Sequence, residues 1–329
     1  LRCDNNQLTS LDVSANAALT YLHCSDNQLT SLDVSKNTAL TSLNCWSNQL
    51  ASLDVSKNTA LNELQCWKNQ LTSLDVSKNK ALDYLSCEEN KLTSLDVSNN
   101  TALTYLHCAD NLLTSLDVSA NTALTVLYCA ENQLTSLDVS KNTALTLLSC
   151  WGNQLTSLDV SSNIALTYLM CSGNSLTYLN MRNGVTDKLN EFYASNNSSL
   201  TCIETLDSDY ATANWTNANG NIDAGVTFAD ICYASNPSYT YVPDNNFEQA
   251  LIDLGYDDVI NDFVLTANIS GITDLDVREK EISDLTGIEA FTALTILHCE
   301  NNQLTSLDVS SNTALTLLFC ENNQLTSLD

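Results

Sequence analysis

Apolar and polar residues alternate in short runs that recur every 21 residues through most of the chain. The unit from Leu40 to Leu61 has two similar halves, L-x-x-L-x-C-x-x-N-x-L and L-x-x-L-x-V-x-x-N-x-x-L. The alternation through L-x-C predicts a short strand with one buried face, and the alternation through L-x-V predicts a similar extended segment. Each half then reaches an asparagine, which bonds readily to nearby backbone and predicts a turn.

The cysteines keep the same interval. A fixed period of this length is typical of a stacked repeat. Each cysteine takes an inward apolar position, so we expect small buried hydrophobic side chains. Disulfides or metal binding are the alternatives, but parallel Cβ vectors suit a disulfide poorly, and zinc needs a convergent cluster rather than a line. The cysteines at this interval are Cys3, Cys24, Cys45, Cys66, Cys87, Cys108, Cys129, Cys150 and Cys171, with Cys299 and Cys320 downstream.

No stretch offers the length and 3.6-residue period of a helix on the wall opposite the first strand. We therefore expect a solenoid that is mostly β, with a parallel sheet on its concave face, short strands or extended segments on the convex side, and small caps. A single unit cannot bury its apolar face alone, so its stability must come from stacking on its neighbours.

The regularity breaks after residue 200, which predicts two tandem arrays. We expect a first array over 1–200, a C-terminal cap over 201–232, a linker over 233–243, an N-terminal cap with introductory repeats over 244–293, and the start of a second array over 294–329. Cys202 and Cys232 lie off the 21-residue interval, and we expect them to form a disulfide in the first cap.

A short helix is expected at the start of the second part. Asp244 suits an N-cap, and Gly255 suits a stop. The apolar residues at helical spacing between them are Phe247, Ala250, Leu251 and Leu254. The sequence begins and ends within a repeat, so we also expect the true ends of the protein to lie outside it.

The L-x-x-L-x-C-x-x-N-x-L core resembles the leucine-rich repeat, with cysteine in place of a leucine. The 21-residue unit with its cysteine ladder is similar to the internalin J type of bacterial surface protein, and NQLTSLDVSxNTAL is similar to repeats of secreted and cell-surface proteins of Bacteroidetes. Residues 264–294 resemble the opening segment of internalin-like arrays. The resemblance implies a leucine-rich-repeat solenoid that is not an enzyme and that acts as an adhesin or binding module outside the cell or on its surface. It does not identify the partner, because this fold hosts many unrelated binding roles.

Variation between repeats gathers at the outward positions of the predicted concave strand, where many residues are aromatic. Exposed tryptophan and tyrosine are typical of binding hot spots. The alternative is that aromatic residues simply favour strands and pack across them. We expect Trp46 to neighbour Trp67, and Tyr84 to neighbour Tyr105. The predicted ligand-binding residues are Tyr21, Trp46, Trp67, Tyr84, Tyr105, Tyr128, Trp151 and Tyr168.

The charge balance is strongly acidic, with 39 Asp and Glu against 12 Lys and Arg, a net charge of −27. Nucleic acid and anionic membranes are poor partners for such a chain, because both require clustered lysine and arginine. No apolar run approaches the roughly 20 residues that cross a bilayer. These features fit an extracellular protein that does not insert into membranes.

The second half of each repeat carries a row of aspartates, which we expect to stack near the strand spacing of about 4.8 Å. Carboxylate oxygens suit Ca²⁺, so a calcium strip is one interpretation. A solvated acidic edge, with hydroxyls and backbone amides bonded to the carboxylates, is the other, because one aspartate per turn supplies few ligands. The row comprises Asp12, Asp33, Asp54, Asp75, Asp96, Asp117, Asp138 and Asp159.

Catalysis finds no support in the sequence. His23, His107 and His298 share a repeat position but lie on distant turns, and no cysteine, serine or carboxylate has an evident base partner. The sequence therefore predicts a binding module that recognises a protein partner and needs no cofactor. Two alternatives remain open: self-association of tandem arrays into a fibre or surface layer, and binding of a surface glycan by the aromatic row.

Overall fold

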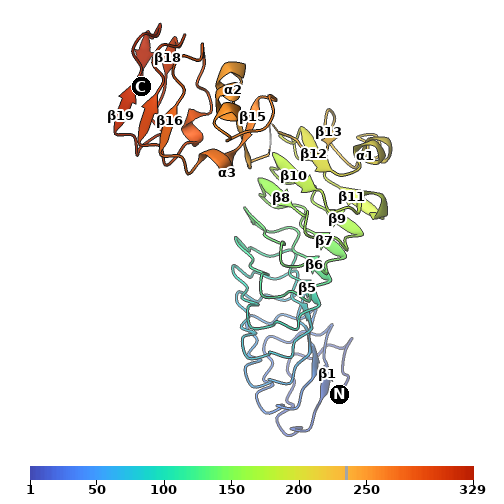
Figure 1. The fold of residues 1–329 in the computed structure, drawn as a ribbon. Helices are drawn as coiled ribbons and strands as arrows, with labels where there is room; N and C mark the ends of the chain where they lie inside the picture. The colour runs from blue at the N-terminus through green and yellow to red at the C-terminus, as the bar shows by residue number, and fades with distance from the viewer. Residues whose placement is uncertain (234–235) are drawn as a thin grey trace. The chain divides into compact units, whose positions relative to one another are not determined.

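A computed structural model describes residues 1–233 and 236–329 of the chain (Figure 1). It contains two compact units, Leu1–Asp230 and Ile231–Asp329. Residues 234–235 of the predicted linker lie outside the described residues. The finer division into arrays, caps and linker stays a prediction.

Unit 1 is a stack of parallel strands that climb along the chain (Figure 1). In its nine-stranded sheet each strand is three residues long and pairs with the equivalent residues of the next turn, as Leu22 with Leu43 and Leu43 with Leu64. The register is set by the repeat, because inward leucines must meet inward leucines. The nine-stranded sheet comprises β1 (Tyr21–His23), β2 (Ser42–Asn44), β3 (Glu63–Gln65), β4 (Tyr84–Ser86), β5 (Tyr105–His107), β6 (Val126–Tyr128), β7 (Leu147–Ser149), β9 (Tyr168–Met170) and β11 (Glu191–Tyr193).

The opposite wall is extended chain at first and becomes a sheet only near the end of the unit. That sheet has the order β13-β12-β10-β8, with β8 (Ser157–Asp159), β10 (Tyr178–Met181), β12 (Cys202–Thr205) and β13 (Thr227–Ala229). Two short helices lie beside it, η1 (Thr186–Lys188) and α1 (Ser208–Asn214). The predicted solenoid, with a concave parallel sheet and short strands or extended segments opposite, is confirmed.

The core of unit 1 is a column of leucine, valine and cysteine. Cys24 and the seven ladder cysteines that follow it have no exposed surface, and they are free thiols. Burial raises the pKa of these thiols, to about 12 for Cys24, Cys108 and Cys150, because a thiolate would lose its hydration. The predicted packing role of the ladder is confirmed.

Two rows of buried asparagines join each turn to the one before it. In the first row, Asn69 Nδ2 donates to the carbonyls of Cys45 and Cys66, each at 3.1 Å, and Asn69 Oδ1 accepts from Leu50 N at 3.0 Å. In the second row, Asn58 Nδ2 donates to the carbonyls of Val34 and Asn37. The same contacts recur along the stack, so the side-chain amides satisfy the backbone groups that the turns would otherwise leave unpaired.

Unit 2 begins with an antiparallel pair of strands and a nine-residue helix. Its elements are β14 (Tyr239–Tyr241), α2 (Asn245–Asp253), β15 (Phe263–Leu265), α3 (Thr266–Ile269), β16 (Asp274–Asp276), η2 (Ile288–Ala290), β17 (Ile296–His298), β18 (Ser306–Leu307), β19 (Leu317–Phe319) and β20 (Ser327–Leu328). Strands β16, β17 and β19 pair in parallel, and so do β18 and β20. No helix in the described ranges 1–233 and 236–329 is long and apolar enough to span a membrane.

Asp244 is the N-cap of α2, as predicted, and its carboxylate also holds a distant loop. Oδ1 accepts from Asn246 N and Phe247 N, while Oδ2 accepts from Ser283 N at 2.8 Å and Asp284 N at 3.0 Å. Phe247, Ala250 and Leu251 are buried. Leu254 is the C-cap residue, directly after the last helical residue, and 41% of its surface is exposed.

Candidate functional site

The outward side chains of the nine-stranded sheet form the candidate site, which we call the concave face. Alternation places the first and third residue of each strand outward, opposite the buried central residue, which is leucine except for Phe192 in β11. The third outward position follows two residues later. Of the predicted residues, Tyr21, Tyr84, Tyr105, Tyr128 and Tyr168 lie on strands, and Trp46, Trp67 and Trp151 lie at the later position.

Two pairs of rings stack face to face on neighbouring turns. The ring centroids of Trp46 and Trp67 are 4.4 Å apart and their planes differ by 7°. Those of Tyr84 and Tyr105 are 4.2 Å apart and differ by 5°. The predicted neighbours therefore do lie side by side. The separation matches the spacing of adjacent strands, about 4.8 Å, so the sheet itself sets the stacking distance.

Tyr128 extends the tyrosine pair through His107. The Tyr128 ring lies 6.1 Å from Tyr105 and 4.8 Å from His107. Trp151 is 42% exposed. Within the described part of the chain, neither Trp151 nor Tyr168 makes a ring contact with another aromatic residue of the concave face.

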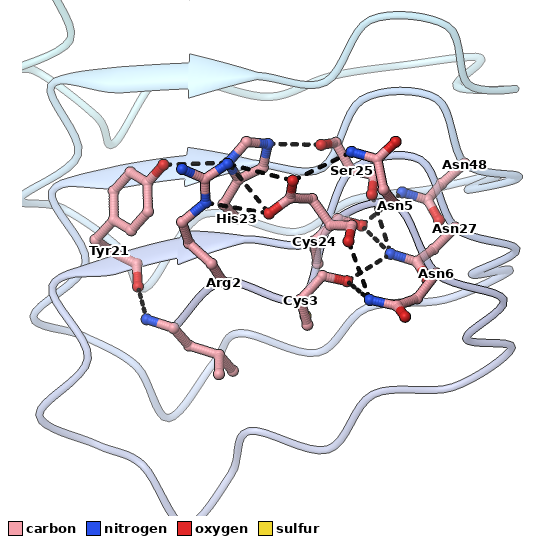
Figure 2. A network of polar contacts seen from close by, with 12 residues as sticks. Arg2, Cys3, Asn5, Asn6, Tyr21, His23, Cys24, Ser25, Asn27 and Asn48 are labelled. Atoms are coloured by element: carbon pink, nitrogen blue, oxygen red, sulfur yellow. Dashed lines mark hydrogen bonds and ion pairs between the residues drawn. The ribbon is translucent and has the colours of Figure 1, made fainter.

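Tyr21 takes part in a polar network on the first strand (Figure 2). Its hydroxyl lies 3.2 Å from His23 Nδ1, and His23 Nε2 lies 2.6 Å from Ser25 Oγ. Arg2 Nε donates to Asp4 Oδ1 at 3.1 Å, and Asp4 Oδ1 lies 3.8 Å from His23 Nδ1. The Arg2 guanidinium lowers the pKa of Asp4 to about 2. This network is local and fixes the His23 ring beside Trp46.

Glu63 and Glu88 are site residues that sequence reasoning missed. Glu63 accepts hydrogen bonds from Ser42 Oγ at 2.8 Å and from Gln65 Nε2 at 2.5 Å. Glu88 accepts from Ser86 Oγ at 2.6 Å, and its Oε1 lies 3.3 Å from His107 Nδ1. Both occupy outward positions that vary between repeats, and this variation was the signal that could have identified them.

Burial governs the titration of the groups around Glu88. It raises the pKa of Glu88 and lowers the pKa of His107 to about 4. It also raises the pKa of Tyr84 and Tyr105, whose phenols remain neutral donors. At neutral pH the imidazole of His107 is uncharged, so the centre of the concave face carries carboxylates among neutral aromatic groups.

The aspartate row directs its oxygens at its own backbone. Asp54 Oδ1 accepts from Ser56 N at 2.8 Å, and the equivalent bond recurs along the row. These amide and hydroxyl contacts from Ser56 lower the pKa of Asp54. The predicted hydrogen bonding of this acidic edge is present. Across residues 1–233 and 236–329, no three histidine, cysteine or acidic side chains are arranged to hold a metal ion.

Cys202 and Cys232, the two cysteines off the 21-residue interval, are disulfide-bonded. The eleven other cysteines are free. That this disulfide closes the C-terminal cap of the first array stays a prediction.

Comparison with known proteins identifies the repeat. Residues 17–58 match the family model described as Leucine Rich repeats (2 copies). Internalin J of Listeria monocytogenes serotype 4b (strain F2365) is 36% identical over 72 residues, which is 22% of this chain and 8% of that protein. The chain thus spans a small part of this curated relative.

Solved structures show the same architecture over nearly the whole chain. The functional domain of InlJ from Listeria monocytogenes, which includes a cysteine ladder, is 34% identical with a TM-score of 0.55; the match covers 96% of this chain and 61% of that one. An internalin, inlF, from the same species is 17% identical with a TM-score of 0.53, over 98% of this chain and 84% of that one.

A plant structure shares the fold alone. The leucine-rich-repeat ectodomain of the receptor kinase GASSHO1/SCHENGEN3 from Arabidopsis thaliana, in complex with CASPARIAN STRIP INTEGRITY FACTOR 2, is 19% identical with a TM-score of 0.50, over 95% of this chain and 35% of that one. The repeat, the parallel sheet and the ladder of buried cysteines together show that this chain is a leucine-rich-repeat solenoid similar to internalin J.

Proposed function

We propose that the chain is an extracellular binding and adhesion module that recognises a protein partner through its concave face. The observation that carries the proposal is the pair of ring stacks, Trp46 on Trp67 and Tyr84 on Tyr105. Rings held in this way lose little conformational freedom on binding. They offer a large, rigid contact area of the kind found at protein–protein hot spots.

The stacking geometry favours a protein over a glycan. A sugar ring needs an open aromatic face, but each stacked ring covers one face of its neighbour, so a pair keeps only its two outer faces. The tryptophan N–H groups and tyrosine hydroxyls of these rings suit the polar groups of a polypeptide.

An extracellular location is supported by the disulfide and the charge. Disulfides persist in oxidising compartments, and Cys202 and Cys232 are disulfide-bonded. The net charge of −27 keeps such a chain dispersed in salt.

Alanine substitution of Trp46, Trp67, Tyr84 and Tyr105 together tests the proposal. Binding of the purified chain to host cells or neighbouring bacterial cells should fall at least about tenfold, since hot-spot truncations each cost roughly 1–2 kcal/mol or more. Ile164→Ala is the matched control, because Ile164 is an apolar side chain that is 65% exposed and lies outside the nine-stranded sheet. Unchanged binding by the fourfold variant, with its fold intact by circular dichroism, would count against the concave face.

A further inference from the structure

The side chains of Glu63, Glu88 and Asn44 place hydrogen-bond acceptors at the centre of the concave face. The hydroxyls of Ser42 and Ser86 and the amide of Gln65 already donate to Glu63 and Glu88. Asn44, on the strand next to Gln65, is 7% exposed, and its Oδ1 has no hydrogen-bond partner within the described residues. Buried acceptors without donors are unfavourable, so a ligand here should bring donors.

The two carboxylates also lack a counter-charge. Across the described residues, no lysine or arginine forms an ion pair with Glu63 or Glu88. His107, which touches Glu88, is neutral at pH 7 because burial lowers its pKa to about 4. From β1 to β11 the outward positions of the sheet contain no lysine or arginine. The side chain of Glu88 is only 14% exposed, so solvent screens its charge poorly.

Each carboxylate lies one turn away from an aromatic ring of the concave face. Trp67 covers Trp46 with one face, and its other face is turned toward the next turn, where Glu88 holds the equivalent position. Tyr84 covers Tyr105 with one face, and its other face is turned toward Glu63 on β3. A ring face beside a carboxylate attracts a flat cation, which can stack on the ring and donate to the oxygens.

We propose that the partner presents a polypeptide segment whose arginine side chains occupy the Trp67–Glu88 and Tyr84–Glu63 pairs. A guanidinium has five donors and no acceptor, so it can donate to these carboxylate and amide oxygens as well as meet the charge. Lysine offers a point charge without a plane to stack, and it is the weaker fit. The inference rests on the proposed function, since it names the chemistry of the partner for that same face.

A library of random peptides displayed on phage, selected on the intact chain, tests the proposal. Selected peptides should be enriched in arginine, and replacing that arginine by the uncharged isostere citrulline should weaken binding at least about tenfold. Glu63→Gln and Glu88→Gln should each weaken binding severalfold and flatten its salt dependence. Glu89→Gln removes the same charge from an exposed neighbouring position, and it should leave binding unchanged.

The outcomes separate the two proposals. Suppose that the selected peptides fail to bind the fourfold alanine variant and yet carry no excess of arginine, or bind Glu63→Gln and Glu88→Gln as well as the original chain. Either result would overturn the arginine proposal and leave protein recognition standing. Peptides that bind the fourfold alanine variant unchanged would overturn both.

Discussion

His107 Nδ1 lies 3.3 Å from Glu88 Oε1 on the adjacent turn, yet the two groups do not form an ordinary ion pair at neutral pH. Burial lowers the pKa of His107 to about 4 and raises the pKa of Glu88, so desolvation outweighs their attraction. The half-buried centre of the concave face therefore titrates differently from the exposed aspartate row.

The pH dependence of stability should report the burial of His107. In the unfolded chain the pKa of His107 is about 6.5. Between about pH 6.5 and pH 4, His107 is therefore protonated in the unfolded chain but not in the folded chain. Stability falls as the pH drops through this window. Because the ring is partly exposed, we expect a loss on the order of 1–2 kcal/mol.

Urea unfolding of the original chain and of His107→Asn at pH 7 and pH 4.5 measures this loss. Asp110 opposes the effect by raising the pKa of His107, and Glu88 offsets part of it because its raised pKa favours proton uptake by the folded chain. Between pH 7 and pH 4.5, the free energy of unfolding should fall less for His107→Asn than for the original chain. Parallel losses in the two proteins would contradict the assignment.

The asparagine rows should be among the most sensitive positions of the chain. Asn69→Ala leaves the carbonyls of Cys45 and Cys66 and the amide of Leu50 without their partner. We expect a loss of about 2–4 kcal/mol in the free energy of unfolding. Gln70→Ala, at the exposed next residue, should change it by less than about 0.5 kcal/mol. Equal small effects would show that the ladder bonds contribute little.

The free thiols should fall into two classes by reactivity. Nine of the eleven are buried, whereas Cys3 and Cys320 are partly exposed. Alkylation of the folded chain should therefore reach Cys3 and Cys320 only, because burial both shields the others and raises their pKa. Mass spectrometry should count eleven modified cysteines after unfolding and thirteen after unfolding with reduction. Rapid labelling of Cys66 in the folded chain would contradict a sealed core.

One backbone position per turn is left-handed, and it should respond to glycine in a predictable direction. Lys68 has φ 54° and Gly152, at the equivalent position four turns later, has φ 67°. Lys68→Gly should raise stability by up to about 1 kcal/mol, because a side chain is strained at this φ. Gly152→Ala should lower stability by a similar amount, since the new Cβ would meet Glu131 Cδ at 3.0 Å.

Lys57→Gly is the control for this pair, because Lys57 is not among the residues with positive φ. Glycine there should lower stability through backbone entropy alone. If both Lys57→Gly and Lys68→Gly shift the melting temperature in the same direction, backbone strain at Lys68 is excluded as the cause.

The register and the inward faces could be predicted because the 21-residue period aligns leucine on leucine, as Leu22 with Leu43. The position of the convex sheet could not be predicted from the sequence. Ser157–Asp159 forms β8, while the identical Ser136–Asp138 one turn earlier is not a strand. The difference lies in the next turn, where β10 supplies pairing partners through Asn180.

The chemistry of the concave face was only partly predictable. Proximity of Trp46 and Trp67 followed from the period, but their parallel stacking depends on side-chain rotamers that the period does not determine. Glu63 and Glu88 occupy positions that vary between repeats, but variation alone does not separate a binding residue from a solvated carboxylate. What distinguishes them is their hydrogen bonding to Ser42 and Ser86, which exists only in three dimensions.

The asparagine rows bear on how such a protein can change in length. Asn69 reaches Cys45, 24 residues earlier, and the same offset recurs at each ladder asparagine from Asn27 to Asn174. If one whole turn were removed or duplicated, the side-chain amide of each remaining ladder asparagine would still find a backbone carbonyl 24 residues earlier. Unequal recombination within the gene could lengthen or shorten the concave face without opening the core, and its reach could evolve separately from its chemistry.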